Sequence, residues 1–180
     1  MNTDEQAGSI ATRARRIKLV LLDVDGVLTD GTLTLHADGS ESKDFNIKDG
    51  AAIVWTMHAG LTVGFLSARE SAATAERARQ LGVTLVTQGA ESKATAYAAI
   101  VAAMNLSDEQ VAYMGDDLVD LAVLRRAGLA AAPADAVAEV AETVHWLSRH
   151  PGGGGAVREL LEMILMAQGR WDGVVRRFSV

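Results

Sequence analysis

The sequence predicts an α/β fold, with a doubly wound, Rossmann-like parallel sheet, helices on both faces and a β-hairpin inserted after the first strand. Short, continuous apolar runs recur along the chain, and such runs are typical of strands buried on both faces. Helical patterns that stop at Gly60, Gly82 and Gly128 separate these runs. Strands that alternate with helices are expected to run parallel, with any site at their carboxyl ends.

The elements follow in a fixed order along one domain. Residues 1–16 form an extension that is helical or flexible from about residue 5, the domain spans 17–168, and 169–180 is a tail. A buried strand at 18–23 precedes a hairpin at 32–47 with an Asp-Gly turn, and Asp49 is the candidate N-cap of a helix to His58. The other expected elements are strands 61–67, 83–87, 111–115, 129–132 and 144–147, and helices 70–81, 91–105, 118–127, 135–142 and 156–168.

Composition excludes several classes of protein. The chain has 180 residues, 49% of them hydrophobic, which is enough for one substantial core. Its net charge of −6 gives no broad basic surface for nucleic acid, and the absence of cysteine excludes a thiolate nucleophile or a cysteine metal site. The acidic start lacks the basic region of a secretory signal, and no apolar run reaches the length of a membrane span. We therefore expect a soluble, cytoplasmic protein.

Acidic residues follow two of the predicted strands. Asp23 and Asp25 come two residues apart before Gly26, and Asp116 and Asp117 follow the strand at 111–115. The acids could instead cap turns or pair with Lys18, and Asp117 could cap the next helix. Together, however, two acidic strand ends would repel each other unless a cation lay between them, and oxygen ligands favour Mg²⁺.

A hydroxyl and an ammonium group complete this pattern. Ser67 follows the strand at 61–67, and Lys93 lies near the start of the helix at 91–105. Beside a metal held by acids, these groups would bind and neutralise a phosphoryl group, which indicates phosphoryl transfer. The four histidines show no metal-ligand spacing and are interpreted as ordinary, partly exposed side chains.

The order of these motifs resembles that of the haloacid dehalogenase-like phosphatases. The motifs are Asp-x-Asp-Gly-Val-Leu-Thr-Asp-Gly from Asp23, Ser-x-Arg from Ser67, the lone Lys93, and Gly-Asp-Asp-x-x-Asp from Gly115. Two further stretches, 45–50 and 152–168, resemble the subgroup of 3-deoxy-D-manno-octulosonate 8-phosphate phosphatases, which serve lipopolysaccharide precursor synthesis. That subgroup commonly has glycine where this chain has Ala68.

The resemblance implies a role for each motif residue. Asp23 would be the nucleophile that forms an aspartyl-phosphate, and Asp25 the acid and base. Mg²⁺ would be bound by Asp23, Asp116 and the main-chain oxygen of Asp25. Asp117 and Asp120 would be further acids of the site.

It also implies a substrate and a set of partners. Ser67 and Lys93 would hold the phosphoryl oxygens, and Arg69 and Lys48 the rest of a phosphorylated sugar acid. The expected substrate is 3-deoxy-D-manno-octulosonate 8-phosphate, and the alternative is an acylneuraminate or other nonulosonate 9-phosphate. A receiver-like phospho-acceptor domain is the alternative of another class, but in receivers the acid pair precedes the phospho-acceptor.

The short spacing between motifs leaves no room for a cap domain, so a neighbouring subunit is expected to cover the site. The family resemblance implies a homotetramer assembled through the hairpins, although the hairpin could instead extend its own sheet. We expect Arg176 or Arg177 of a neighbour's tail to help bind the substrate's carboxylate, and Trp171 or Phe178 to exclude water. Alternatively, the tail is frayed, as terminal residues usually are.

Overall fold

The computed structural model describes residues 3–179, with side chains described from Ile10 onward. Its centre is a six-stranded parallel sheet in the order β5-β4-β1-β6-β7-β8, which confirms the predicted fold class. The strands are β1 (Leu19–Leu22), β4 (Thr62–Leu66), β5 (Leu85–Thr87), β6 (Val111–Met114), β7 (Leu129–Ala132) and β8 (Trp146–Leu147). No helix within the described residues is both long and apolar enough to cross a membrane.

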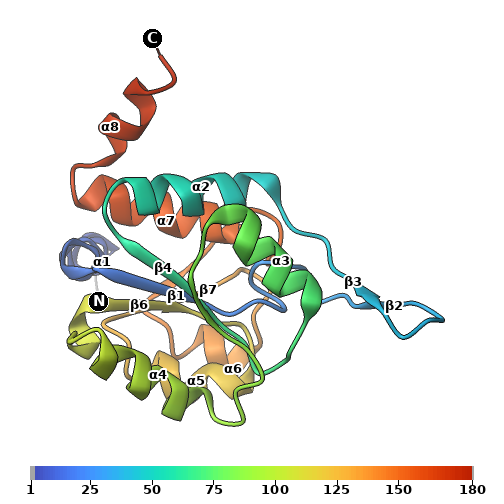
Figure 1. Cartoon of the computed structure of the whole chain (residues 1–180). Helices are drawn as coiled ribbons and strands as arrows, with labels where there is room; N and C mark the ends of the chain where they lie inside the picture. The colour runs from blue at the N-terminus through green and yellow to red at the C-terminus, as the bar shows by residue number, and fades with distance from the viewer. Residues whose placement is uncertain (1–2, 180) are drawn as a thin grey trace.

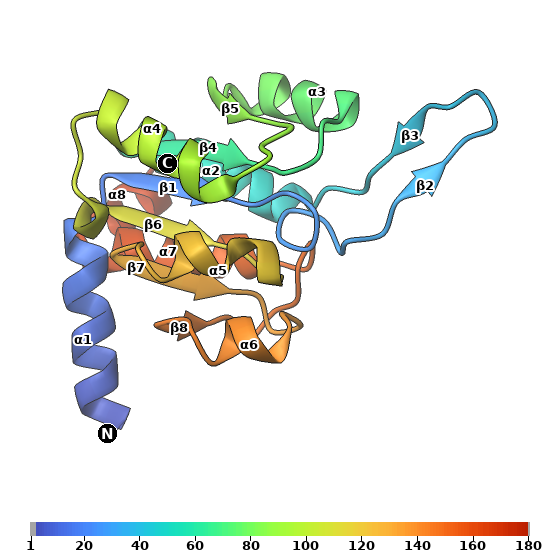
Figure 2. The ribbon, with the colours of Figure 1, turned by 90° about the horizontal axis from the view of Figure 1, so that it is seen from below.

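Helices cover both faces of the sheet (Figures 1 and 2). One layer holds α2 (Ile47–His58), α3 (Ala72–Leu81) and α7 (Ala156–Ala167), and the opposite layer holds α4 (Lys93–Ala103), α5 (Leu121–Leu124) and α6 (Ala138–Ala141). Outside these layers, α1 (Thr3–Arg16) contacts α7, and α8 (Trp171–Arg176) follows α7 at the amino end of the strands. Two short 3₁₀ turns, η1 (Asp108–Gln110) and η2 (Leu118–Asp120), flank β6.

Alternation along β1 explains why its continuous apolar run is a strand. Val20 and Leu22 pack into the core on the side of α2 and α7, whereas Leu19 and Leu21 pack on the side of α4 and α5. Successive side chains of a strand point to opposite faces, so a strand covered on both sides is apolar throughout. Leu19–Leu22 is fully buried.

Two predicted helix boundaries were wrong. Asp49 does not cap α2, because the side chain of Asn46 accepts bonds from the first backbone N–H groups, and Asp49 lies buried in the first turn. The predicted helix 118–127 divides into η2 and the short α5. There the Asp120 carboxylate turns back to accept bonds from the N–H groups of Asp116 and Asp117, which tightens the first turn.

The hairpin has the predicted turn but a short ladder. Gly39 adopts φ +85° in the turn, and β2 (Thr34–Leu35) pairs only with β3 (Glu41–Ser42). After β3 the chain stops pairing and returns to the body of the protein, where Lys43 and Glu41 form ion pairs with two residues of the cleft described below. The hairpin forms a sheet of its own and projects beyond the carboxyl edge of the main sheet (Figure 2).

Candidate active site

Two predicted acids lie at the switch point of the sheet. The chain leaves β1 toward β4 and β5, then returns to β6 on the other side, so the crevice between β1 and β6 is where doubly wound sheets bind ligands. Asp23 directly follows β1, and Asp116 lies two residues after β6. They open onto a cleft of about 210 Å³ lined by Asp23, Asp25, Ser67, Ala68, Arg69, Lys93, Asp116, Asp117 and Val119.

The acids come close enough to share a cation. Asp23, Asp116 and Asp120 each place one carboxylate oxygen within 4.8 Å of the others. Burial, followed by the charges of Asp23 and Asp120, raises the pKa of Asp116 to about 7. Burial also raises the pKa of Asp23 to about 6, although Lys93 opposes this shift. Asp116 Oδ1 is buried and has no hydrogen-bond partner among the described residues, which fits an oxygen that can ligate a cation.

Lys93 forms ion pairs with two of these acids, Asp23 and Asp120. It is the first residue of α4, which is capped by the side chain of Ser92, and its Nζ lies 2.8 Å from Asp23 Oδ2 and 2.7 Å from Asp120 Oδ1. Burial alone would lower the pKa of Lys93, but the two carboxylates outweigh it and raise that pKa. The ammonium group therefore stays charged beside the predicted nucleophile.

Asp120 organises the second acidic motif. Its fully buried carboxylate accepts bonds from Lys93 and the Tyr113 hydroxyl, and from the N–H groups of Asp116 and Asp117. A Cβ at Gly115 would lie 2.5 Å from the Asp120 carboxyl carbon, so glycine is required there. Asp117 is exposed and bonds the N–H of Leu118, as its capping role predicts. The structure thus joins Asp120, and not Asp117, to the acid cluster.

The glycine-rich segment after Pro151 supports the loop that follows Asp23. A Cβ at Gly152 would lie 1.9 Å from the carbonyl oxygen of Gly26, and the N–H of Gly153 donates to Val27 O at 3.0 Å. Asn46 also donates to the carbonyl of Gly153, which ties the start of α2 to this contact. What the sequence shows only as a loop of unusual freedom is therefore a close packing surface.

Ser67 and Arg69 stand on the side of the cleft formed by β4. Ser67 is buried at the end of the strand, and its Oγ accepts the N–H of Arg69 at 3.2 Å. This leaves the hydroxyl proton free to donate to an anion. Ala68 is exposed and lines the cleft, so its methyl group faces the space that a ligand would use.

Two charged residues of the hairpin reach the cleft and were missed by the sequence reasoning. Lys43 Nζ lies 2.6 Å from Asp25 Oδ1, and Glu41 Oε2 lies 2.9 Å from Arg69 Nη2. Alternating charge along a hairpin arm is ordinary on a solvated face, so nothing in the sequence singled these residues out. The structure shows that the arm after β3 folds toward the carboxyl edge of the main sheet.

Three predicted substrate residues lie away from the acid cluster. Lys48 is exposed in the first turn of α2. Arg176 and Arg177 are exposed at the end of α8, at the amino end of the strands and so opposite the cleft (Figure 1). The tail is helical over Trp171–Arg176. Trp171 and Phe178 pack against Trp55 of the same chain, with ring centroids 6.2 and 5.3 Å away.

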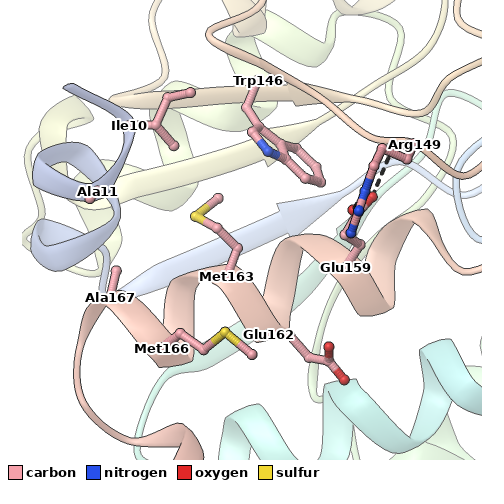
Figure 3. Close-up of a pocket in the computed structure, with 9 residues that line it drawn as sticks. All are labelled: Ile10, Ala11, Trp146, Arg149, Glu159, Glu162, Met163, Met166 and Ala167. Carbon is pink, nitrogen blue, oxygen red and sulfur yellow. Dashed lines mark hydrogen bonds and ion pairs between the residues drawn. The ribbon is translucent and has the colours of Figure 1, made fainter. Parts of the chain in front are cut away.

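A second cavity has a different character. It encloses about 550 Å³ between α1, β8 and α7, and its wall is largely apolar around Trp146, Met163 and Met166 (Figure 3). Of its three charged residues, Arg149 and Glu159 pair with each other, and Glu162 pairs with Arg158. It contains neither the acid cluster nor Lys93, so the chemistry belongs to the cleft between β1 and β6.

Comparison with known proteins agrees with this geometry. The haloacid dehalogenase-like hydrolase family matches residues 66–160. The 3-deoxy-D-manno-octulosonate 8-phosphate phosphatases of Yersinia pestis and Escherichia coli K12 are 38% and 36% identical to the chain. They align over 93% and 92% of it, and over 89% and 88% of their own lengths. The chain therefore belongs to the haloacid dehalogenase-like hydrolases, which confirms the resemblance of its motifs.

Solved structures extend the likeness to the whole fold. The Moraxella catarrhalis 3-deoxy-D-manno-octulosonate 8-phosphate phosphatase, in complex with magnesium, phosphate and the sugar acid KDO, superposes with a TM-score of 0.93 at 32% identity. That match covers 98% of this chain and 99% of the other. The enzyme from Yersinia pestis gives a TM-score of 0.90 at 38% identity, over 92% and 89% of the two chains. The family assignment sets aside the receiver-like alternative.

Proposed function

We propose that this protein is a Mg²⁺-dependent phosphatase that hydrolyses 3-deoxy-D-manno-octulosonate 8-phosphate through an aspartyl-phosphate at Asp23. The observation that carries the proposal is the meeting of Asp23, Ser67, Lys93 and Asp116 in one cleft at the switch point. The relatives with this activity align over nearly the whole chain, including the hairpin and the glycine-rich segment.

The acid cluster fits a magnesium ion. Asp23 and Asp116 supply carboxylate oxygens, and Asp116 Oδ1 is buried without a hydrogen-bond partner in the part of the chain that the structure describes. The main-chain oxygen of Asp25 is the third protein ligand that we propose. A bound Mg²⁺ would offset the repulsion between these acids and the negative charge of the phosphoryl group. It would also hold Asp23 ionised near neutral pH.

Asp23 is the nucleophile and Asp25 is the general acid and base. An Asp23 oxygen attacks phosphorus, the bond from phosphorus to the sugar oxygen breaks, and Asp25 gives that oxygen its proton. Asp25 then takes a proton from a water molecule that attacks phosphorus, which releases inorganic phosphate and restores the Asp23 carboxylate. Lys93 keeps Asp23 oriented through their 2.8 Å ion pair.

Ser67, Arg69 and Lys48 bind the substrate in this proposal. The free hydroxyl proton of Ser67 and the ammonium of Lys93 face the phosphoryl oxygens. Arg69 lies on the Asp25 side of the cleft, 3.7 Å from that carboxylate, where the sugar must lie. Lys48, on the first turn of α2, would contact the far end of the sugar acid.

A homotetramer would complete the site. The described residues include no cap domain, and α8 lies at the opposite end of the sheet from the cleft (Figure 1). Arg176 and Arg177 of a tail can therefore reach an active site only on another subunit, where they would help bind the substrate's carboxylate. Trp171 and Phe178 would exclude water there after leaving Trp55.

Phosphate release from a panel of sugar phosphates tests the proposed activity. We expect Mg²⁺-dependent turnover with the highest kcat/KM for 3-deoxy-D-manno-octulosonate 8-phosphate. A higher kcat/KM for N-acetylneuraminate 9-phosphate would select the alternative substrate class. No turnover of any phosphate ester in the presence of Mg²⁺ would refute the phosphatase itself.

A further inference from the structure

The arm that follows β3 places a buried lysine against Asp25. The Lys43 ammonium nitrogen lies 2.6 Å from Asp25 Oδ1, and the Lys43 side chain is only 1% exposed. A buried ammonium group is destabilising by several kcal/mol unless an anion lies beside it. Asp25 is that anion in this structure.

Arg69 brings a second cation to the same carboxylate. Its Nε lies 3.7 Å from Asp25 Oδ2, and its Nη2 lies 2.9 Å from Glu41 Oε2. Oδ2 of Asp25 is buried and accepts no hydrogen bond from any described residue. Two cations and two anions, from the loops after β1 and β4 and from the hairpin arm, thus form one network. We call it the hairpin charge network: Asp25, Glu41, Lys43 and Arg69.

The hairpin charge network lies on the side of the cleft where the leaving group of the substrate would bind. Lys93 bonds Asp23 and Asp120 and so belongs to the end of the cleft that holds the phosphoryl group. Asp25 is the residue that must contact the oxygen between phosphorus and sugar. Cations attached to Asp25 from the hairpin side therefore face the leaving group and not the transferred group.

We propose that Lys43, together with Arg69, binds the carboxylate of the sugar acid and is a specificity-determining residue of this phosphatase. This inference rests on the proposed function and names its substrate class, a phosphate monoester whose leaving group carries a second anion. The carboxylate of the substrate can replace Asp25 as the partner of Lys43 and Glu41 as the partner of Arg69. Lys43 then has a counter-ion both before and after the substrate binds. A neutral sugar offers no replacement, and binding it gains nothing from the network.

A purely structural role for Lys43 predicts a different result. If Lys43 only fastened the hairpin to the cleft, its loss would displace Asp25 and reduce turnover of every phosphate ester alike. Substrates that differ in the carboxylate therefore separate recognition from fastening. Arabinose 5-phosphate is a suitable partner for the comparison, because it is also a primary phosphate ester of a sugar but has no carboxylate.

The test compares Lys43→Met with the parent on these two substrates. Removing one charge-assisted interaction should raise KM for 3-deoxy-D-manno-octulosonate 8-phosphate by about 10- to 100-fold, with kcat changed less than about three-fold. The kcat/KM for arabinose 5-phosphate should stay within about three-fold of the parent value. Lys43→Arg should restore most of the lost affinity because it restores the charge.

Two further variants keep the result interpretable. Lys18→Met removes an exposed lysine before β1, at the opposite end of the sheet, and should change neither substrate's kinetics. Lys43→Gln keeps a donor for Asp25 without the charge and, if Lys43→Met does not fold, should show the same selective rise in KM. Equal losses on both substrates, or an unchanged KM for the sugar acid, would overturn the inference.

The outcome for the parent enzyme separates this inference from the proposed function. If the parent prefers N-acetylneuraminate 9-phosphate, the proposed substrate is wrong. The same comparison, with that carboxylate as substrate, then tests Lys43. If the parent hydrolyses arabinose 5-phosphate as well as either sugar acid, the carboxylate is not recognised and the role of Lys43 is refuted although the phosphatase stands.

Discussion

Gly26→Ala should damage the metal site more than the fold. Gly26 has φ +86°, and a Cβ built on it would lie 2.0 Å from Oδ2 of Asp116. Contacts of a real Cβ below 3.0 Å essentially do not occur, so the carboxylate must move by about 1 Å. The side chain that yields is a proposed Mg²⁺ ligand and not a core residue.

The expected magnitudes follow from these two effects. An alanine in the left-handed region costs about 1–2 kcal/mol of stability. A displacement of about 1 Å in a reacting group costs about 100-fold in rate. We therefore expect the free energy of unfolding to fall by about 1–2 kcal/mol, and the apparent affinity for Mg²⁺ and kcat to fall at least about ten-fold.

Gly82→Ala is the matched control. Gly82 ends α3 with φ +74°, and nothing lies within 4 Å of the Cβ that alanine would add. Both variants should lose similar stability in urea unfolding, but only Gly26→Ala should require more Mg²⁺ for hydrolysis of p-nitrophenyl phosphate. If Gly26→Ala has the Mg²⁺ dependence and kcat of the control, the contact between Gly26 and Asp116 does not shape the site.

Four further outcomes are expected. Asp23→Asn should retain the fold and less than about one part in a hundred of the parent's phosphate release, because the nucleophile is lost; greater activity would contradict covalent catalysis. Chelation should stop the reaction and added Mg²⁺ restore it, whereas full activity in metal-free protein would remove Asp116 from the mechanism. The pKa of Asp116 is raised to about 7 from an ordinary 3.8, so between these pH values the native metal-free protein keeps a proton that the unfolded chain has released. Its free energy of unfolding therefore falls as pH rises from about 4 to 7. Measured by urea unfolding against Asp116→Asn, this fall should appear without metal and disappear with saturating Mg²⁺, and parallel pH profiles of the two proteins without metal would refute it. Truncation after Gln168 should reduce kcat/KM for the sugar acid phosphate far more than for p-nitrophenyl phosphate, and equal losses would exclude the tail from substrate binding.

Local patterns were sufficient to predict most of the fold. The apolar runs Leu19–Leu22 and Val111–Met114 are buried on both faces, so composition alone marks them as strands. Ligand sites of doubly wound sheets lie at the carboxyl ends of the strands, and this rule predicts that Asp23 and Asp116 lie close together. Helix ends were harder, because Asn46 and Asp49 are both good capping residues. Asp49 instead accepts a bond from the N–H of Arg158, a tertiary contact that the local sequence does not indicate.

The hairpin side of the site could not be predicted in this way. Lys43 looks like any lysine on an exposed arm, and its burial depends on how the chain turns after β3. The role of Lys48 follows from its place in the stretch that resembles the family, and it stays a prediction. The roles of Arg176 and Arg177 also stay predictions, because they require a second subunit. Contacts made across turns or between chains leave no periodic signal in a sequence.

The central claim is that Asp23 carries the phosphoryl group during turnover. Acid quenching of the parent enzyme within its first turnover of 3-deoxy-D-manno-octulosonate 8-phosphate with Mg²⁺, followed by peptide mass spectrometry, measures this directly. We expect a phosphoryl group on the peptide that contains Asp23, absent from Asp23→Asn and from enzyme quenched without Mg²⁺. Turnover at the full rate with no phosphoryl group on that peptide at any quench time, or with the group on another residue, would contradict it.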